Sequence, residues 1–201
     1  MKTLLKKILP KSFISLYHKT LAVLAAFVYR FPSEKMIVVG VTGTNGKSST
    51  VELIAKALES GGAKVGAAST VKFKIAAKEK LNDKKMTMLG RFQLQKMLKQ
   101  MVEADCRYAV IEVSSEGIKQ FRHLGINFDY AVFTNLTPEH IESHGSFDNY
   151  KRAKAKLFKR LSESKNKLID GKTVTKTILV NADDEHGDYY LEFKADKKIE
   201  F

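Results

Sequence analysis

Short apolar runs alternate with longer amphipathic segments between residues 36 and 180. Runs of consecutive apolar residues predict buried strands, whereas apolar residues that recur every three or four positions predict helices. The predicted strands are residues 36–41, 64–68, 108–113, 130–134 and 177–180. The predicted helices are residues 47–60, 92–104 and 147–161. This alternation indicates an α/β fold of three layers, with helices on both faces of a doubly wound, mostly parallel sheet.

The N-terminal segment has a different pattern. Residues 1–7 are basic and residues 21–29 are apolar, in the outline of a signal peptide or a short anchor. The apolar run is about half of the roughly 20 residues that a spanning helix needs. We therefore expect residues 1–35 to be a basic and apolar helical segment, appended to a domain over residues 36–201. Its helix packs on that domain, or alternatively lies on a membrane surface through its basic and apolar faces.

The polar, Lys-rich residues 71–85 predict a hairpin or a loop. Over the whole chain, 35 Lys and Arg against 22 Asp and Glu give a net charge of +13, which favours polyanionic partners. Aromatic residues are not interleaved with the basic ones as a base-stacking platform, so we expect phosphorylated small molecules and no nucleic acid. The single cysteine, Cys106, fits a reducing cytoplasm and predicts a small buried apolar side chain.

The predicted strands turn polar where they end. In an open α/β sheet, ligands bind beyond the carboxyl ends of the strands. Four such ends carry polar segments, at residues 42–49, 112–115, 134–140 and 181–184. We expect these four segments to meet at one edge of the sheet.

The first segment resembles a phosphate-binding loop. Its glycines let backbone N–H groups point inward, Lys47 can neutralise phosphate oxygens, and the Ser48 hydroxyl can bind Mg²⁺. The strict pattern requires glycine where Val41 stands, but the loop has a strand before it and a helix after it. We predict a nucleotide site at the consecutive residues Gly43, Thr44, Asn45, Gly46, Lys47, Ser48 and Ser49.

Three further ionisable residues are candidates for chemistry. Glu112 ends an apolar strand, where an unpaired carboxylate is costly, so it pairs with a lysine or binds a metal. His140 is a metal ligand or a hydrogen-bonded structural residue. Lys154 falls inside the apolar stripe of the predicted helix over residues 147–161. It either extends from the edge of that stripe to solvent or contacts a carboxylate as a buried ammonium.

Five motifs, in this order along residues 36–187, resemble the central domain of the Mur ligase family. They are GTNGKS at residues 43–48, EVSS at 112–115, the segment 133–145 with FTNLTPEH, the helix residues Tyr150 and Ala153-Lys154, and NADD at 181–184. The chain is most similar to the MurE-like branch, which makes UDP-N-acetylmuramoyl-tripeptides.

The resemblance implies an ATP-dependent, amide-forming acid–amino-acid ligase of peptidoglycan precursor synthesis that acts through an acyl phosphate. It implies ATP and Mg²⁺ as cofactors, and ATP, a UDP-muramoyl peptide and an amino acid as small-molecule partners. By similarity, Lys154 matches a carbamylated lysine. The residues expected to be catalytic are Lys47, Glu112, His140 and Lys154, and the metal ligands are Ser48, Glu112, His140 and Lys154. Asn181 and Asp184 would join the nucleotide site, and Thr87, Ser114, Gln120 and Arg122 would bind the muramoyl substrate.

The chain also departs from the family pattern. Met88 replaces one threonine of a pair, Glu116 stands where histidine is frequent, and Pro138-Glu139 stands where Arg-Asp is common. A folylpolyglutamate-synthase-like ligase and a non-catalytic ATP-binding fragment are therefore alternatives. Because complete family members carry further domains on both sides, we expect a truncated chain that is incomplete at its C-terminal end. Its missing parts are either supplied by a partner chain or absent from this sequence, in which case the chain alone binds ATP and Mg²⁺ without completing the amide.

Overall fold

The computed structural model describes residues 11–84, 86–139 and 144–201, and within them eight strands form one sheet. The strand order is β10-β9-β6-β1-β5-β2-β3-β4. The strands are β1 (Ile37–Thr42), β2 (Val65–Ala68), β3 (Lys72–Ile75), β4 (Lys78–Leu81), β5 (Tyr108–Glu112), β6 (Tyr130–Phe133), β9 (Thr177–Val180) and β10 (Lys197–Glu200). All neighbours pair in parallel except β2 with β3 and β3 with β4, which are antiparallel.

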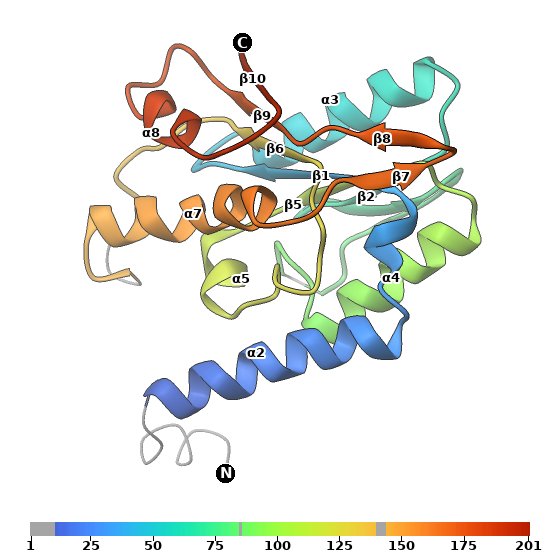
Figure 1. The fold of residues 1–201 in the computed structure, drawn as a ribbon, viewed down its shortest axis with the longest axis horizontal. Helices are drawn as coiled ribbons and strands as arrows, with labels where there is room; N and C mark the ends of the chain where they lie inside the picture. The colour runs from blue at the N-terminus through green and yellow to red at the C-terminus, as the bar shows by residue number, and fades with distance from the viewer. Residues whose placement is uncertain (1–10, 85, 140–143) are drawn as a thin grey trace.

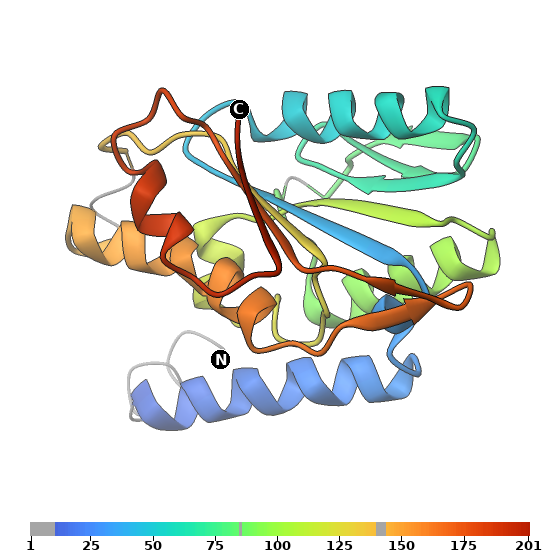
Figure 2. The same cartoon turned by 45° about the horizontal axis from the view of Figure 1, so that its top comes forward.

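Helices cover both faces of this sheet (Figures 1 and 2). One face carries α3 (Lys47–Ser60), and the other carries α4 (Arg91–Glu103), the short α5 (Ser115–Lys119) and α7 (Phe147–Ser162). Helix α2 (Lys11–Val28) lies outside α4, and η1 (Pro32–Lys35) joins it to β1. The three-layer, mostly parallel α/β fold expected from the sequence is therefore confirmed, with the N-terminal helix appended.

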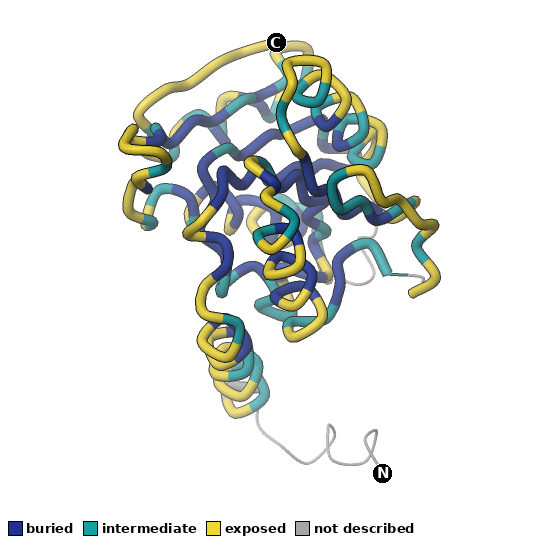
Figure 3. Tube along the Cα trace, turned by 90° about the vertical axis from the view of Figure 1, so that its right-hand side faces the viewer, coloured by how far each residue is buried: buried dark blue, intermediate teal, exposed yellow. Residues whose placement is uncertain are grey.

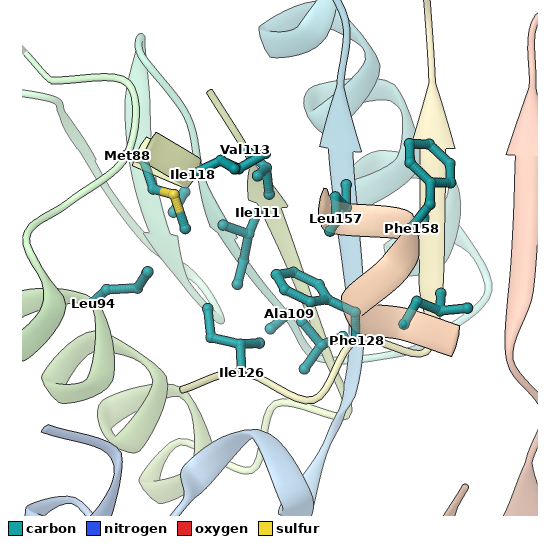
Figure 4. Packing of buried hydrophobic residues seen from close by; sticks show 14 of the residues in the cluster. Met88, Leu94, Ala109, Ile111, Val113, Ile118, Ile126, Phe128, Leu157 and Phe158 are labelled. Atoms are coloured by element: carbon teal, nitrogen blue, oxygen red, sulfur yellow. The ribbon is translucent and has the colours of Figure 1, made fainter. Parts of the chain in front are cut away.

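The central strands are buried because they lie between two apolar layers. All six residues of β1 are buried. On the α3 face, Val39 and Val41 pack with Val51 and Ala55. On the opposite face, Phe128 and Leu157 lie against β1 (Figure 4). A side chain at Gly40 would come within 2.9 Å of both, so glycine allows this close approach.

A buried charge cluster holds a second, two-stranded sheet of β7 (Lys167–Ile169) and β8 (Lys172–Val174) to the domain. The carboxylate of Asp129 is fully buried and accepts hydrogen bonds from Lys167 Nζ at 2.6 Å, Lys176 Nζ at 2.9 Å and the backbone amide of Val38 at 2.8 Å. Lys176 also donates to the carbonyl of Phe128. The cluster therefore ties the segment after α7 to the start of the central strand.

The longer predicted elements are confirmed within one or two residues, and residues 71–85 contain the β3–β4 hairpin. Helix α2 packs on the domain through buried alanines, as expected. Cys106 is buried, and burial raises the pKa of its thiol. Sequence patterns did not predict α5, α8 (Gly187–Leu191) or the β7–β8 pair, because these elements of three to five residues form neither an apolar run nor a recognisable period. Within the described residues, no helix combines the length and apolar character needed to cross a membrane.

Candidate functional site

The loop between β1 and α3 lies at the carboxyl edge of the sheet, beside the central strand. Gly46 is the N-cap of α3 and has φ +77°, a conformation that a residue with a side chain rarely adopts. A side chain at Gly43 would come within 1.9 Å of the Thr134 hydroxyl. Because Gly46 has no side chain to cap the first amide groups of a 14-residue helix, those groups suit an anion.

The segment after β6 braces this loop. The amide of Thr44 donates to the carbonyl of Asn135 at 2.8 Å, and the amide of Asn45 donates to Asn135 Oδ1 at 2.8 Å. The hydroxyl of Thr134 donates to the carbonyl of Asn45, also at 2.8 Å. The two segments that sequence analysis placed at one edge therefore do meet, and the loop is held in shape by protein contacts alone.

Lys47, the loop lysine, is turned back onto its own loop. Its Nζ donates to the carbonyl of Thr44 at 2.6 Å. Burial lowers the pKa of Lys47, while the carboxylates of Glu112 and Glu139 act in the opposite direction. The lysine is thus held within the loop by a single backbone acceptor that a phosphate oxygen could replace.

Glu112 lies at the end of β5 with its carboxylate facing α3, and only 2% of the residue is exposed. Ser48 Oγ donates to Glu112 Oε2 at 2.7 Å. The amide of Thr70 donates to the same oxygen at 2.7 Å, and the Thr70 hydroxyl lies 3.1 Å from both carboxylate oxygens. Among the described residues, hydroxyl and amide groups hold Glu112, so the lysine pair that the sequence left open is not what the structure shows.

Lys154 lies in the middle of α7 and is only 1% exposed. Its Nζ donates to the carbonyl of Gly43 at 2.6 Å and lies 4.2 Å from the centre of the Tyr150 ring. Burial, together with the positive charge of Lys47, lowers the pKa of Lys154 to about 7. Extension to solvent from the stripe edge is therefore wrong, and the contact is a backbone carbonyl of the loop instead of a carboxylate.

A cleft of about 440 Å³ opens between the loop and α5. Its lining includes Gly43, Lys47 and Lys154. It also includes Thr87, Ser114 and Arg122, which the resemblance assigned to the acceptor, and the remaining lining residues are Met86, Met88, Ser115, Glu116, Gly117, His144 and Tyr150. The cleft therefore joins the candidate nucleotide loop to three of the four candidate acceptor residues.

The fourth, Gln120, lies behind the cleft wall and orients Arg122. Arg122 Nη2 donates to Gln120 Oε1 at 2.7 Å, and Gln120 Nε2 donates to Glu116 Oε1 at 2.8 Å. Arg122 also donates to the carbonyl of Met88, and Arg91 donates to the carbonyl of Gln120. Burial lowers the pKa of both guanidinium groups, and the Nε atom of each is buried without an acceptor in the described part of the chain. Arg122 therefore brings a guanidinium group to the cleft, whereas Arg91 is not among the lining residues.

The remaining predicted residues lie around this centre. Asp184 accepts hydrogen bonds from the backbone amides of Leu136 and His186, and Asn181 Nδ2 donates to the carbonyl of Thr134 at 3.0 Å. Both therefore support the segment after β6. Residues 140–143, which include His140, lie outside the described residues. The described residues hold no group of three or more His, Cys, Asp or Glu side chains arranged around a metal position.

Two contributions could not be read from the sequence motifs: Thr70, and the hydrogen bonds of Asn135 to the loop. Thr70 follows β2 at the carboxyl edge of the sheet, where Ser69 and Thr70 end an apolar strand. The change from apolar to polar residues at a strand end, which identified the other four segments, therefore also identifies residues 69–70.

Comparison with known proteins gives one family. Residues 41–201 match the family model described as the Mur ligase middle domain. The UDP-N-acetylmuramyl-tripeptide synthetase of Roseiflexus sp. (strain RS-1) is 43% identical over 174 residues, which cover 86% of this chain and 34% of that protein. The protein of the same name from Treponema pallidum (strain Nichols) is 38% identical over 170 residues, 84% of this chain and 31% of that protein. This chain thus spans about a third of the length of these relatives.

Two solved structures show the same arrangement. A UDP-N-acetylmuramoyl-L-alanyl-D-glutamate–2,6-diaminopimelate ligase matches with a TM-score of 0.72 and 27% identity, over 90% of this chain and 36% of that one. Escherichia coli FolC, in complex with DHPP and ADP, matches with a TM-score of 0.61 and 18% identity, over 89% of this chain and 46% of that one. The second likeness extends to the fold alone.

Proposed function

The chain belongs to the Mur ligase family, and from that premise we propose that it supplies the ATP and Mg²⁺ site of an amide-forming ligase that adds an amino acid to a UDP-N-acetylmuramoyl peptide. The observation that carries the proposal is the cleft whose lining contains both the lysines Lys47 and Lys154 and the candidate acceptor residues Ser114 and Arg122. ATP and a carboxylate are both anionic, so a site that joins them must supply cations and hold both reactants in line.

The loop over residues 43–49 would hold the phosphates of ATP. Its shape is already fixed by Thr134 and Asn135, so little ordering is needed on binding. Lys47 would exchange the Thr44 carbonyl for a phosphate oxygen, a stronger partner because the hydrogen bond then joins two charges. Asn181 and Asp184 would contribute by supporting the bracing segment.

Ser48 and Glu112 fit a magnesium ion. Their side-chain oxygens lie 2.7 Å apart in a partly buried position, and Mg²⁺ takes oxygen ligands in a small octahedral shell. When bound there, Mg²⁺ would offset the charge of the phosphate groups. Thr70 would keep the Glu112 carboxylate oriented, and His140, by similarity, would bind a second ion.

Lys154 would act as a carbamate. Its amine loses its proton readily in this site, and a neutral amine attacks the carbon of CO₂, forming a C–N bond and releasing one proton. The product is an anion beside Lys47, which removes the repulsion between two buried ammonium groups. The carbamate nitrogen keeps one hydrogen, so the bond to the Gly43 carbonyl can persist.

The acceptor would lie in the cleft against Thr87, Ser114 and Arg122, with Gln120 orienting the arginine. Its carboxylate oxygen attacks the terminal phosphorus of ATP, the bond to ADP breaks, and an acyl phosphate forms. The amine of an amino acid then attacks the acyl carbon, and phosphate leaves. Groups that hold that amino acid would come from outside the matched region, on the same chain or on a partner chain. ATP and a nucleotide-linked peptide fit the cytoplasmic location expected from the sequence.

A folylpolyglutamate-synthase-like acceptor is less well supported, because the likeness to FolC is limited to the fold. The test is the change in melting temperature with ATP and Mg²⁺, followed by ADP formation on addition of a UDP-N-acetylmuramoyl dipeptide or a folate. We expect nucleotide to raise the melting temperature, Lys47→Ala to abolish the rise, and Lys56→Ala, on an exposed position of the same helix, to keep it. No rise in the unaltered protein would refute the nucleotide site, and a rise without ADP formation would leave a non-catalytic ATP-binding module.

A further inference from the structure

Helix α2 presents its small residues to the domain and its large apolar residues to solvent. Ala22, Ala25 and Ala26 are buried, and Gly125 lies so close that a side chain there would come within 2.8 Å of the Ala22 carbonyl. The exposed apolar residues on and just after the helix are Phe13, Leu16, Tyr17, Val23, Leu24, Phe27, Val28 and Phe31. In Figure 3, exposed and buried residues lie on different sides of this helix.

Apart from a gap at Thr20, these exposed residues recur at helical spacing, so those from Phe13 to Val28 form one stripe along the helix, about 22 Å long at 1.5 Å per residue. Leu16 is 62% exposed and Phe27 is 68% exposed. A shallow groove of about 510 Å³ runs along the stripe, lined by Lys19, Thr20, Val23, Leu24, Phe27 and Phe31. A continuous apolar surface of this kind on an outer helix indicates an interaction site.

The sequence before and along the stripe is basic. The first 33 residues contain five lysines and one arginine and no acidic residue, and three of these lysines precede the described residues. The first acidic residue, Glu34, is exposed just after the stripe, and its amide donates to the carbonyl of Phe31 at 3.0 Å. Lys19 Nζ lies 5.2 Å from the centre of the Phe121 ring, and Lys156 Nζ, from α7, lies 6.0 Å from the same ring. Basic groups from two helices thus meet along one flank of the stripe.

We propose that α2 lies in the interface of a membrane that contains anionic lipids, with its apolar stripe among the acyl chains and its basic residues at the headgroups. Binding of such a helix increases with its buried apolar area and with its attraction to anionic lipid. A second copy of the chain fits less well, because a symmetric pair of α2 helices would place basic residues opposite basic residues with no acid between them.

Cosedimentation of the 201-residue protein with lipid vesicles tests this proposal. We expect binding to vesicles of phosphatidylcholine mixed with phosphatidylglycerol to be at least about tenfold stronger than to phosphatidylcholine alone, and to weaken as salt is added. Equal affinity for both vesicles, or binding to neither, overturns the proposal.

Matched variants separate the stripe from the rest of the surface. The double variant Leu16→Ser/Phe27→Ser should lose more than about tenfold in vesicle affinity, and Lys19→Glu should lose about fivefold or more. Leu53→Ser is the control, since Leu53 is 68% exposed but lies on α3, across the sheet. All of these positions are exposed, so melting temperatures and the response to ATP should stay the same. A comparable loss in the control, or size-exclusion profiles showing a dimer that the double variant dissociates, refutes the membrane assignment.

Discussion

The ammonium of Lys154 donates to the carbonyl of Gly43 at 2.6 Å, across 111 residues of sequence. The contact joins α7 to the first residue of the nucleotide loop and places a buried cation next to Lys47. A buried lysine of this kind lowers stability while it is protonated. Because its pKa is lowered to about 7, the titration of Lys154 can be measured.

Stability should rise with pH because of Lys154. Its pKa is about 7 in the folded protein against an ordinary 10.5, so between these values the unfolded chain binds more protons than the folded one. The free energy of unfolding should therefore increase with pH in this window, by up to about 1.4 kcal/mol per pH unit from this group. Urea titrations at several pH values in bicarbonate-free buffer give this dependence. The free energy of unfolding should rise less steeply with pH for Lys154→Met than for the unaltered protein. Lys156→Met, at an exposed position, should keep the original slope, and an unchanged slope for Lys154→Met would contradict the prediction.

Bicarbonate should modify Lys154 directly. With ¹³C-labelled bicarbonate near pH 8, we expect a carbamate carbon resonance that disappears in Lys154→Ala and remains in Lys156→Ala. The measurement needs no turnover, so it is independent of any substrate. In an activity assay, short-chain carboxylic acids should partly restore Lys154→Ala. Full activity of that variant without added acid would show that the carbamate has no role.

Gly43→Ala should abolish nucleotide binding. The added methyl group would lie 1.9 Å from Thr134 Oγ1 and 3.1 Å from the Asn135 amide, so the loop and its brace must separate. We expect a loss of about 1–3 kcal/mol in the free energy of unfolding and no rise in melting temperature with ATP. Gly90→Ala is the control, since its nearest neighbour would be 3.6 Å away, and it should retain the ATP response. Wild-type affinity for ATP in Gly43→Ala would show that the contacts of Thr134 and Asn135 do not determine the conformation of the loop.

Contacts between residues close in the sequence could be predicted for this site, whereas contacts between residues far apart in the sequence could not. The loop residues Gly46 and Lys47 could be predicted because strand, loop and helix are contiguous. Helical periodicity also placed Lys154 in the apolar stripe of α7, but it left open whether the ammonium is buried or extends to solvent. The partner of Lys154, Gly43, could not be predicted, because a contact across 111 residues depends on the strand order, and the same holds for Thr70 and Glu112.

The charge cluster at Asp129 shows the same limit more strongly. Lys167 comes after a run of exposed basic residues and has no local feature that distinguishes it from them. Only the path of the chain after α7, which returns past the start of β1, brings it to Asp129. Sequence patterns therefore predicted which elements form and where the loop lies, but not which distant charges are paired in the core.

Asp129→Asn should be strongly destabilising. The variant leaves the ammonium groups of Lys167 and Lys176 buried without their carboxylate, and breaking a buried ion pair in this way costs about 3–5 kcal/mol. Urea denaturation measures the loss. Asp105→Asn serves for comparison, since its pair with Lys64 is exposed and should contribute less than about 1 kcal/mol. Similar losses in the two variants would mean that the buried cluster does not hold the β7–β8 pair.

Arg122→Lys should weaken acceptor binding and leave nucleotide binding intact. The guanidinium is oriented by Gln120 and lines the cleft, and its hydrogen bonds go to Gln120 and Met88 instead of to the loop over residues 43–49. Lysine keeps the charge but loses the planar pair of donors, and a hydrogen bond to a charged group contributes about 1.5–3 kcal/mol. Calorimetry should therefore show at least about tenfold weaker binding of the UDP-muramoyl peptide and the same affinity for ATP. Arg152→Lys, at an exposed position of α7, should change neither affinity. An equal loss for both ligands would mean that Arg122 supports the whole site, and no loss for the peptide would place the acceptor elsewhere.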